Sequence, residues 1–439
     1  MAASDLRKRM RTEIDAIPFI DTHEHLTRPA ERYKGTVDFH TLFAHYASSD
    51  LISAGMPWED LCTLHDQNVP LSKRWKLFKP FWQAIHNTCY ARALRIAIRD
   101  IYGIDDITDA TYKKLSDAMQ AKNKKGFYQK VLRDMANIEV GVMCVGEPIP
   151  KEDEDLFVGS LWINDQFLLR KRGDVRRECN AIGRSSYRLD DLVDRINQRM
   201  AWAVEVGMVS TKISMAYERT LLVGDPSRTE AEDVLARVRL SDGQLSHEEA
   251  KPLCDYLIHE AVRACGEVGL PVQIHTGIHE GNGNWISNSD PKGLTRLFMD
   301  HPGTKFDLFH GSYPFTSSLA VLAKNFPNVH PDMCWLHCIS QSISFKLLEE
   351  LIDTVPMNKI LAFGGDYIFP EGSYGHAVMA RETITRVLCK KVEEGYFTED
   401  EALTCARWVM HDAADRLFGI SDRRKKRAPR KKAAKKRKR

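Results

Sequence analysis

Pro18-Phe-Ile-Asp-Thr-His-Glu-His-Leu26 places two histidines two residues apart, directly behind a short apolar run. Side chains at i and i+2 of a strand point to the same face, so His23 and His25 would present both rings on one side. Neutral imidazole is the commonest protein ligand for divalent metals, and two rings supply half of a four-coordinate zinc site. An isolated His-x-His pair also occurs on ordinary surfaces, so other segments must decide its meaning.

Three later segments repeat the pattern of an apolar run that ends in a metal-binding residue type. They are Leu270-Pro-Val-Gln-Ile-His275-Thr-Gly-Ile-His279, Lys305-Phe-Asp-Leu-Phe-His310-Gly-Ser-Tyr313 and Lys359-Ile-Leu-Ala-Phe-Gly-Gly-Asp366-Tyr367. Short apolar runs of this kind are typical of buried parallel strands. The carboxyl ends of such strands form the active-site face of a (β/α)₈ barrel. The four segments together predict a metal site at that face.

A strand count supports an α/β fold, a (β/α)₈ TIM-like barrel with a helical insertion after strand one and a disordered basic C-terminal tail. Helical patterns separate most of the strands, which favours parallel βα units. Gly364 and Gly365 would let the backbone turn tightly after the last strand. After the first strand, we expect strands at Ile138–Val145, Phe157–Ile163, Gly207–Ser214, Val272–Thr276, Phe306–His310, Val329–Cys334 and Ile360–Gly364.

The predicted organisation is one metal-dependent (β/α)₈ domain at residues 1–422 and a separate tail at 423–439. Barrels of this type exceed 400 residues when their loops carry insertions. Aromatic residues recur with helical spacing in about residues 30–137, which predicts a helical cap over the barrel mouth. The residues of this cap that we considered for contact with a substrate are Tyr90, Arg92 and Arg95.

Composition is that of an ordinary globular protein, with 439 residues, 43% hydrophobic and 28% charged. The sequence has neither an 18-residue apolar run nor an apolar signal-peptide core near Met1, so we expect no membrane contact. The ten cysteines follow no framework spacing, which favours a cytoplasmic protein with reduced thiols. Cys334-Trp-Leu-His-Cys338 could bind a metal, but buried thiols are the simpler interpretation. We also expect a homo-oligomer.

The net charge of +3 hides an uneven distribution, because residues 423–439 hold 13 Lys or Arg and no acid. The rest of the chain therefore has ten more acids than bases. A run of this kind is typical of a disordered appendage that can contact nucleic acid without sequence specificity. Docking onto the acidic body, solubility and nuclear targeting are the alternatives.

The order of the motifs, His-x-His followed by Lys, His, His and Asp, resembles the amidohydrolase superfamily. The flanking segments are similar to its amidohydrolase-related branch, including the domain that some proteins fuse to a glutamine-synthetase module. More distantly, they resemble uronate isomerase. The matching segments are Asp21–Leu26, Thr211–Tyr217, Gln273–Gly277, His310–Phe315, Pro327–Asp332, Phe363–Tyr367 and Pro370–Glu371.

The resemblance implies one divalent metal, held by His23, His25, His275 and Asp366 with one position left for water. Zinc is the expected ion, and manganese or iron would accept the same ligands. Asp366 would also accept the proton of that water and deliver it to the leaving group. His310 would polarise a carbonyl or act as a second ligand.

Lys212 has two interpretations under the same resemblance. In binuclear members a carbamylated lysine bridges two metals, and His275 with His310 would then hold the second ion. We favour an unmodified Lys212 that contacts a substrate carboxylate or phosphate. Pairing with a buried acid is the third possibility. The remaining candidates for substrate binding are Tyr217, Arg219, Trp285 and Tyr313, with Glu218 standing where related proteins have arginine.

The predicted function is a metal-dependent hydrolase that cleaves an amide, ester or lactone bond of a small carboxylate-bearing molecule. A sugar-acid isomerase similar to uronate isomerase and a metal-dependent decarboxylase are the alternatives, because one barrel hosts many chemistries. A catalytically inactive barrel that its basic tail localises is the non-enzyme alternative.

Overall fold

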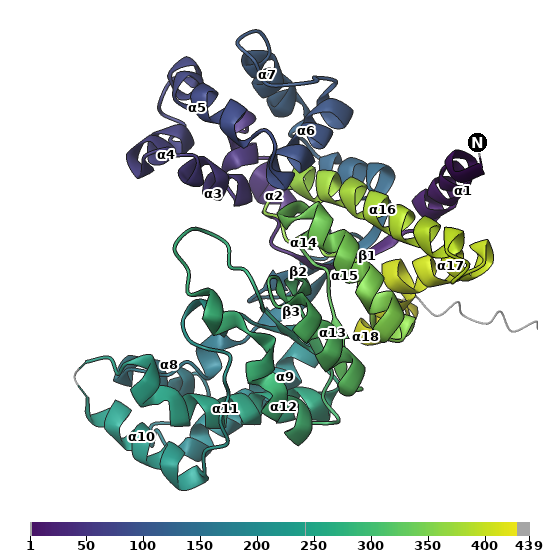
Figure 1. Cartoon of the computed structure of the whole chain (residues 1–439). Coiled ribbons are helices and arrows are strands. Elements are labelled where there is room, and N and C mark those ends of the chain that lie inside the picture. Colours follow the sequence, from purple (N-terminus) through teal and green to yellow (C-terminus); the bar gives the residue numbers. More distant parts are fainter. Residues whose placement is uncertain (1, 242, 428–439) are drawn as a thin grey trace, which may run out of the picture.

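The computed structural model describes residues 2–241 and 243–427, and in this part of the chain seven parallel strands form one sheet in chain order. The expected parallel α/β arrangement is present, with helices around the sheet (Figure 1). The strands are β1 (Phe19–Glu24), β2 (Ile138–Val145), β3 (Phe157–Trp162), β4 (Ser210–Ile213), β5 (Val272–Ile274), β6 (Phe306–Leu308) and β7 (Val329–Pro331).

The predicted eighth strand, Ile360–Gly364, is not a regular strand. It forms one isolated parallel bridge, between Leu361 and Asp332 just after β7. On its other side, the Thr22 amide of β1 donates a hydrogen bond of 3.1 Å to the Phe363 carbonyl. The segment therefore lies between β7 and β1, in the place expected for an eighth strand, without the repeated ladder that defines one.

Gly364 and Gly365 are required by close packing, which corrects the expectation that they serve a tight turn. A Cβ atom on Gly364 would lie 2.5 Å from Thr22 Oγ1 and 2.7 Å from Cys334 Sγ. A Cβ atom on Gly365 would collide with the carboxyl group of Glu24. Neither glycine has a positive φ. The absence of a side chain is what lets this segment approach β1.

The described helices are α1 (Ala2–Ala16), α2 (Pro29–Arg32), α3 (Tyr46–Ser53), α4 (Trp58–His65), α5 (Leu71–Ile85), α6 (Cys89–Tyr102), α7 (Tyr112–Lys122), α8 (Arg172–Asn180), α9 (Leu189–Glu205), α10 (Arg228–Leu240), α11 (His247–Val268), α12 (Thr295–Asp300), α13 (Thr316–Asn325), α14 (Leu336–Ile339), α15 (Gln341–Thr354), α16 (Pro370–Glu393), α17 (Glu399–Arg407), α18 (Ala413–Phe418) and α19 (Ile420–Arg427). Helices α2 to α7 lie between β1 and β2 in the chain, and α3 to α7 form a group beside the sheet in Figure 1.

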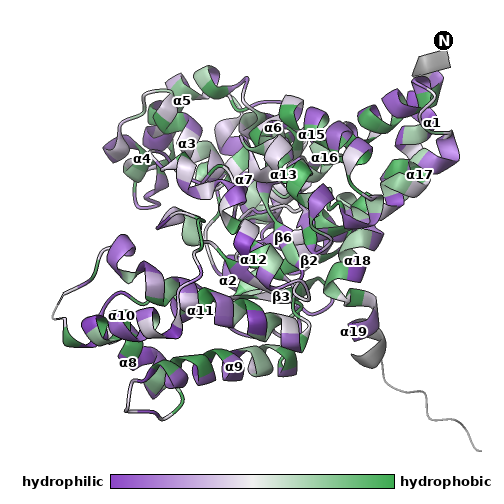
Figure 2. Cartoon of the chain, turned by 60° about the horizontal axis from the view of Figure 1, so that its bottom comes forward, coloured by the Kyte–Doolittle hydropathy of each residue, from purple (hydrophilic) through white to green (hydrophobic). Residues whose placement is uncertain are grey.

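The outer helices follow from their sequence periodicity and their caps. On α9 the buried residues Leu189, Leu192, Ile196 and Met200 recur every three or four positions, which places them on one helical face. Figure 2 shows hydrophilic and hydrophobic residues mixed along α9 and α11 accordingly. The Ser246 hydroxyl accepts from the Glu249 amide and starts α11 with a capping box.

Gln273 on β5 organises a polar layer inside the sheet. Its amide nitrogen donates to the Thr22 carbonyl at 2.9 Å and to Asp307 Oδ2 at 3.0 Å. Its amide oxygen accepts from the hydroxyls of Ser160 and Ser210 at 2.8 and 3.2 Å. All of these side chains are buried. Because every hydrogen-bonding position of the amide is used, this layer fixes five strands relative to one another.

The C-terminal region differs from the prediction for residues 423–439. Helix α19 continues to Arg427, so residues 423–427 are helical and not disordered. The Arg423 guanidinium donates to the Met208 carbonyl at 2.7 Å, which connects the helix to the segment before β4. The rest of the predicted tail, residues 428–439, lies outside the described residues.

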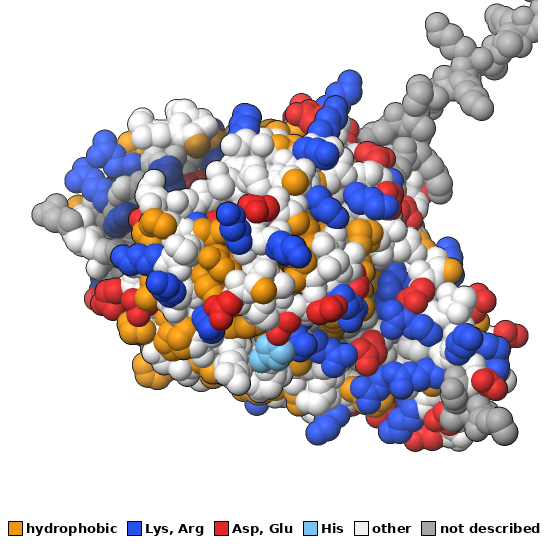
Figure 3. All heavy atoms as spheres, turned by 90° about the horizontal axis from the view of Figure 1, so that it is seen from above, with side chains coloured by type: hydrophobic (Ala, Val, Ile, Leu, Met, Phe, Trp, Pro, Cys, Tyr) orange, Lys and Arg blue, Asp and Glu red, His pale blue; other side chains and the backbone are white. Residues whose placement is uncertain are grey.

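Charged side chains of both signs are interspersed on the face seen from above in Figure 3. Ion pairs among the described residues include Arg9 with Glu399 at 2.7 Å and Arg92 with Glu382 at 2.8 Å. None of the helices in the described part of the chain has the length and apolarity needed to cross a bilayer.

A buried ion pair fastens the helices after β1 to α16. The guanidinium of Arg32 on α2 lies 2.6 Å from the carboxylate of Glu371, and both side chains are almost fully buried. The hydroxyl of Tyr102 on α6 donates to the same oxygen at 2.7 Å. Removing one partner of such a pair is costly, because the other charge stays buried without compensation.

We therefore predict that Glu371→Ala lowers the free energy of unfolding by about 3 kcal/mol or more. Arg92→Gln, which breaks the exposed pair with Glu382, should cost less than about 1 kcal/mol. Chemical denaturation followed by circular dichroism measures both. Equal losses in the two variants would contradict the role given to Glu371.

Candidate metal centre and cavity

His23 and His25 lie at the carboxyl end of β1 with their Nε2 atoms 3.1 Å apart. Two nitrogens bound to one zinc ion at 2.0–2.1 Å would be about 3.0–3.4 Å apart, so the observed spacing fits a shared ion. Burial, with a smaller contribution from Lys212, lowers the pKa of His25 to about 3 and that of His23 well below its ordinary value. Both rings are therefore neutral at physiological pH, which is the form that binds metal.

Asp366 brings a carboxylate to the same point. Its Oδ1 atom lies 3.4 Å from His25 Nε2 and 3.8 Å from His23 Nε2. Burial raises the pKa of Asp366 to about 6, and the opposing effect of the nearby Lys212 ammonium is smaller. The predicted ligands His23, His25 and Asp366 are thus brought together, and they form one nitrogen and oxygen donor set that fits a divalent ion.

The backbone of Asp366 is held in an uncommon conformation. Its φ is +59°, which non-glycine residues seldom adopt. The Asp366 amide donates to the His23 carbonyl at 2.8 Å, and the Tyr46 hydroxyl donates to the Asp366 carbonyl at 2.5 Å. His310 and Trp335 also have positive φ values, of 63° and 64°. Such residues persist only where the surroundings fix them, and they concentrate at functional sites.

His275 is placed differently from the prediction that it is a ligand beside His23 and His25. Its Nε2 atom contacts the Ile278 carbonyl at 2.9 Å, and its Nδ1 atom faces His310 Nε2 at 2.9 Å. The structure therefore brings His275 together with His310 and does not place it in a three-residue ligand group with His23 and His25.

The hydrogen-bond partners of His275 and His310 favour a cation between the two rings. A carbonyl oxygen only accepts, so His275 carries its proton on Nε2, toward Ile278. By the same argument His310 carries its proton on Nδ1, which lies 3.1 Å from the Cys334 carbonyl. The two facing nitrogens are then both lone pairs. Burial lowers the pKa of both rings well below the ordinary value, so a metal ion suits this contact better than an extra proton does.

Lys212 is buried at the end of β4, with its ammonium 3.8 Å from the centre of the Phe309 ring. Among the described residues no ion pair involves Lys212, so the interpretation as a lysine paired with a buried acid is wrong. Burial lowers the pKa of Lys212, and the carboxylate of Asp366 opposes that effect. An ammonium without a protein partner, at the wall of a cavity, is suited to an anionic ligand.

The side chains of His25, Lys212, His275 and Asp366 line a cavity of about 570 Å³ beside the carboxyl ends of the strands. Its volume suits a small molecule. The lining residues are His25, His45, Tyr46, Trp162, Asn164, Lys212, Ser214, Tyr217, Glu218, His275, Glu280, Asp366 and Ile368. Lys212 is the one Lys or Arg in that set.

Of the four predicted substrate-binding residues, only Tyr217 lines this cavity, where its ring lies 4.7 Å from that of His275. Arg219 points elsewhere, because its guanidinium forms a buried ion pair of 2.6 Å with Asp255. Trp285 is 78% exposed and outside the lining set. Tyr313 is also outside that set, and its backbone carbonyl accepts from Ile278. The last three assignments are therefore not supported.

The helices after β1 contribute residues that the sequence did not single out. His45 and Tyr46 line the cavity, and the Tyr46 ring stacks on Trp335 with centroids 4.2 Å apart. Tyr90, one of the cap residues that we considered, stacks on Tyr46 with centroids 5.4 Å apart and on Trp335 with centroids 6.3 Å apart. Arg92 instead pairs with Glu382. No strand periodicity marks His45 and Tyr46, because they enter the site from a cap and not from the barrel.

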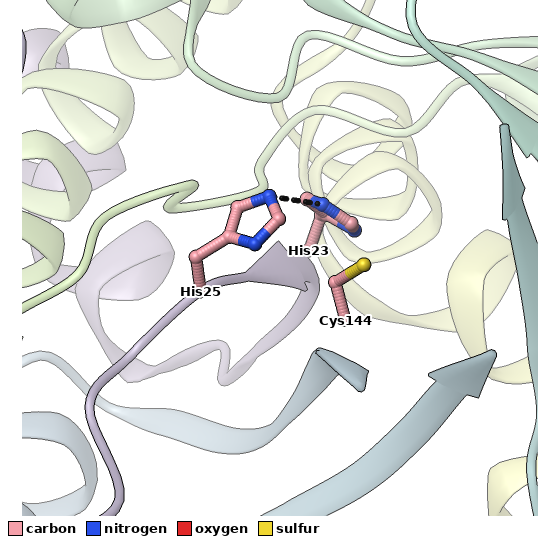
Figure 4. A group of neighbouring side chains, drawn as sticks. All are labelled: His23, His25 and Cys144. Carbon is pink, nitrogen blue, oxygen red and sulfur yellow. Dashed lines mark hydrogen bonds between the residues drawn. The ribbon is translucent and has the colours of Figure 1, made fainter. Parts of the chain in front are cut away.

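Two thiols also lie at the site. Cys144 on β2 forms a group with His23 and His25, and Cys334 forms one with His310 and Asp366. In each group the candidate ligand atoms are within 4.8 Å of one another. Figure 4 shows the Cys144 side chain next to His23. Cys338 is in neither group, and it is buried, as the interpretation of Cys334 and Cys338 as buried thiols expects.

A third group, made of Asp225, His259 and Asp300, is unsuited to a metal. Arg296 already forms ion pairs with Asp225 and Asp300 at 2.6 and 2.5 Å. Both ring nitrogens of His259 are engaged, with Gly224 and His301. This group serves as a control for the site at β1.

We predict that His23→Ala and His25→Ala each reduce metal affinity by at least about 100-fold, since loss of a direct ligand should exceed the 10–100-fold typical of outer-sphere changes. The fold should persist, because these side chains are at the strand ends. His259→Ala should retain the metal. Elemental analysis after dialysis, with circular dichroism of each variant, measures the result. Wild-type metal content in both histidine variants would refute the site.

Sequence comparison finds two relationships. Residues 223–420 match the model of the amidohydrolase family. Over 180 residues the chain is 27% identical to Protein fluG of Emericella nidulans. That match covers 40% of this chain and 21% of the fungal protein, so the chain spans about a fifth of the length of the curated relative it matches.

Structure comparison finds uronate isomerases over nearly the whole chain. Uronate isomerase from Thermotoga maritima superposes with a TM-score of 0.78 at 16% identity, covering 94% of this chain and 97% of the other. Glucuronate isomerase from Caulobacter crescentus gives 0.74 at 18% identity and covers 95% of each chain. A metal-dependent hydrolase fold from Lactobacillus casei gives 0.61 at 16% identity, covering 93% of this chain and 97% of the other. At these identities the likeness concerns the fold.

Proposed function

The comparisons support an enzyme of the amidohydrolase-related branch with similarity to uronate isomerase, and from that premise we propose a metal-dependent hydrolase of small carboxylate-bearing amides, esters or lactones. The observation that carries the proposal is the convergence of His23, His25 and Asp366 at one edge of a cavity that His25, Asp366 and the Lys212 ammonium line.

The donor set fits one divalent ion at His23, His25 and Asp366, with zinc as the proposed metal and manganese or iron as alternatives. Once bound there, such an ion polarises a substrate carbonyl and acidifies a water molecule.

Asp366 is the proposed proton carrier of this site. Its carboxylate accepts a proton from the attacking water and then delivers it to the leaving nitrogen or oxygen. The pKa of about 6 supports this role, because the group is mostly ionised at neutral pH yet close enough to that pH to hold a proton briefly. Its rigid backbone keeps the carboxylate in position between the two steps.

Lys212 is the proposed binding group for the carboxylate of the substrate, and Tyr217 the proposed wall of the same pocket. The ammonium is the one Lys or Arg group lining the cavity, and no described acid pairs with it. His310 is proposed to orient the substrate carbonyl from the neighbouring strand end. His275 is retained as a proposed ligand only through its contact with His310.

The contact between His275 and His310 favours an alternative form of the site with a second metal ion. The opposed lone pairs of His275 and His310 suit a metal ion, and the lowered pKa of Lys212 would favour the neutral amine that carbamylation requires. One metal remains the primary proposal. A metal count decides the question, since two ions per chain would support the bridged arrangement.

An isomerase of uronic acids is the second candidate function. It is favoured by the extent of the structural match, which covers 94% of this chain and therefore includes the helices after β1. Lys212 would bind the sugar carboxylate in either reaction. A screen of amides, lactones and uronates with product identification by mass spectrometry separates the two, because hydrolysis adds water to the products and isomerisation does not change the mass.

The ten cysteines are all free thiols, which supports the proposal of a cytoplasmic protein. Assembly into a homo-oligomer and weak nucleic-acid contact through residues 428–439 remain proposals. Both are measured directly, by light scattering and by salt-dependent DNA binding.

We predict that Asp366→Asn reduces kcat by about 100-fold or more on whichever substrate the screen identifies, while metal content falls much less. An amide oxygen still ligates, but it cannot accept a proton. Steady-state kinetics and elemental analysis of the same preparation measure the two effects. Unchanged turnover would remove the proton-carrying role. Asp225→Asn, at the surface, is the matched control.

A further inference from the structure

We propose that the Cys144 thiolate is a direct ligand of the metal at His23 and His25, which makes this a sulfur-containing centre with zinc selectivity. The inference rests on the proposed metal centre and adds to it a ligand that its histidine and aspartate motifs do not include. It starts from the sulfur atom, which joins His23 and His25 in one group of potential ligand atoms within 4.8 Å of one another.

The strand register explains why the sulfur is there. β2 pairs with β1 in parallel, with Met143 of β2 opposite Glu24. Cys144 is therefore the next residue along β2, at the height where β1 presents His25. It also lies opposite Ser160 on β3, so regular pairing with β3 fixes its backbone on that side. A side chain on such a rigid element keeps its position when an ion binds.

Cys144 fills a role that the sequence assigned to His275. The expected imidazole from β5 points toward His310 and Ile278, and it leaves the side of His23 nearest β2 without a ligand from β5. Cys144 occupies that side in Figure 4. The two nitrogens and this sulfur would then hold the ion together, and the next position would be left for Asp366, water or substrate.

Binding of the ion at this thiol involves a balanced exchange. The S–H bond of Cys144 breaks, its proton leaves to solvent, and the sulfur lone pair forms the bond to the metal. No oxidant or reductant takes part. The consequence is selectivity, because thiolate favours zinc over manganese or magnesium, whereas the histidine and carboxylate ligands alone tolerate all of them.

Cys334 provides an internal comparison. It forms the corresponding group with His310 and Asp366, but it is fully buried and packed against the position of Gly364. Cys144 is partly accessible. The two thiols therefore lie close to the same centre. The proposal predicts that replacing Cys144 removes the metal–sulfur bond and that replacing Cys334 does not.

The test is the absorption spectrum of the full-length protein loaded with Co²⁺, because a sulfur bound to cobalt gives a near-ultraviolet charge-transfer band that nitrogen and oxygen ligands do not give. We expect the band in the wild-type protein and in Cys334→Ser. It should disappear in Cys144→Ser, which should still bind cobalt through the remaining ligands. Zinc affinity should fall by at least about tenfold in Cys144→Ser, with manganese affinity changed less.

Three outcomes would overturn the proposal. They are a cobalt-loaded wild type without the band, a band that survives in Cys144→Ser, and a band lost in Cys334→Ser but kept in Cys144→Ser. In all three the visible cobalt bands would still report the metal centre, so the proposed function would stand. A protein that binds no cobalt, zinc or manganese would refute both proposals together.

A measurement on the unmodified chain covers the case in which Cys144→Ser does not fold. Wild-type protein is treated with iodoacetamide, with and without zinc, and each cysteine peptide is quantified by mass spectrometry. Zinc should protect Cys144 at least about tenfold, because its bond to the metal competes with alkylation. The exposed Cys62 should react equally in both samples. Equal alkylation of Cys144 in both samples would contradict the bond.

Discussion

Three consecutive backbone amides, those of Gly365, Asp366 and Tyr367, hydrogen-bond to β1, and the site depends on this contact. They donate to the Asp21 carboxyl at 2.9 Å, to the His23 carbonyl at 2.8 Å and to the Glu24 carboxyl at 2.8 Å. The contact joins the last segment of the sheet to the first strand. It also places the Asp366 carboxylate beside the two imidazoles that β1 supplies.

The side chains of β1 that accept two of these amides are the buried acids Asp21 and Glu24, and burying either carboxylate alone would be costly. Burial raises the pKa of Asp21 to about 7 and that of Glu24 well above its ordinary value. The two carboxyl groups hydrogen-bond to each other, so they share a proton more readily than they carry two charges. Each also accepts a backbone amide, which satisfies groups that water cannot reach. The same arrangement explains why residue 365 lacks a side chain.

The metal-binding chemistry and the cap are linked through Tyr46. Its hydroxyl donates a hydrogen bond to the Asp366 carbonyl, and its ring stacks with those of Tyr90 and Trp335. Arg32, Tyr102 and Glu371 fasten other parts of the cap to α16. The hydrogen bond between the Tyr46 hydroxyl and the Asp366 carbonyl would therefore transmit a movement of the cap to Asp366. A rigid cap thus helps to keep the Asp366 carboxylate in position.

The sequence alone determined the parallel α/β arrangement and the convergence of His23, His25 and Asp366, because strand periodicity and the shared carboxyl edge of parallel strands are local rules. It did not determine that Ile360–Gly364 forms only a single bridge, because the hydrogen bonds of this segment depend on partners from other parts of the fold, among them Pro331, Val409 and Thr22. The tertiary structure decided that His275 faces His310 and that Arg219 forms an ion pair with Asp255. It also decided that Cys144, His45 and Tyr46 lie at the site. The physical reason is that a side chain's direction is set by the ring, ion pair or strand beside it, and spacing along the chain does not specify those neighbours.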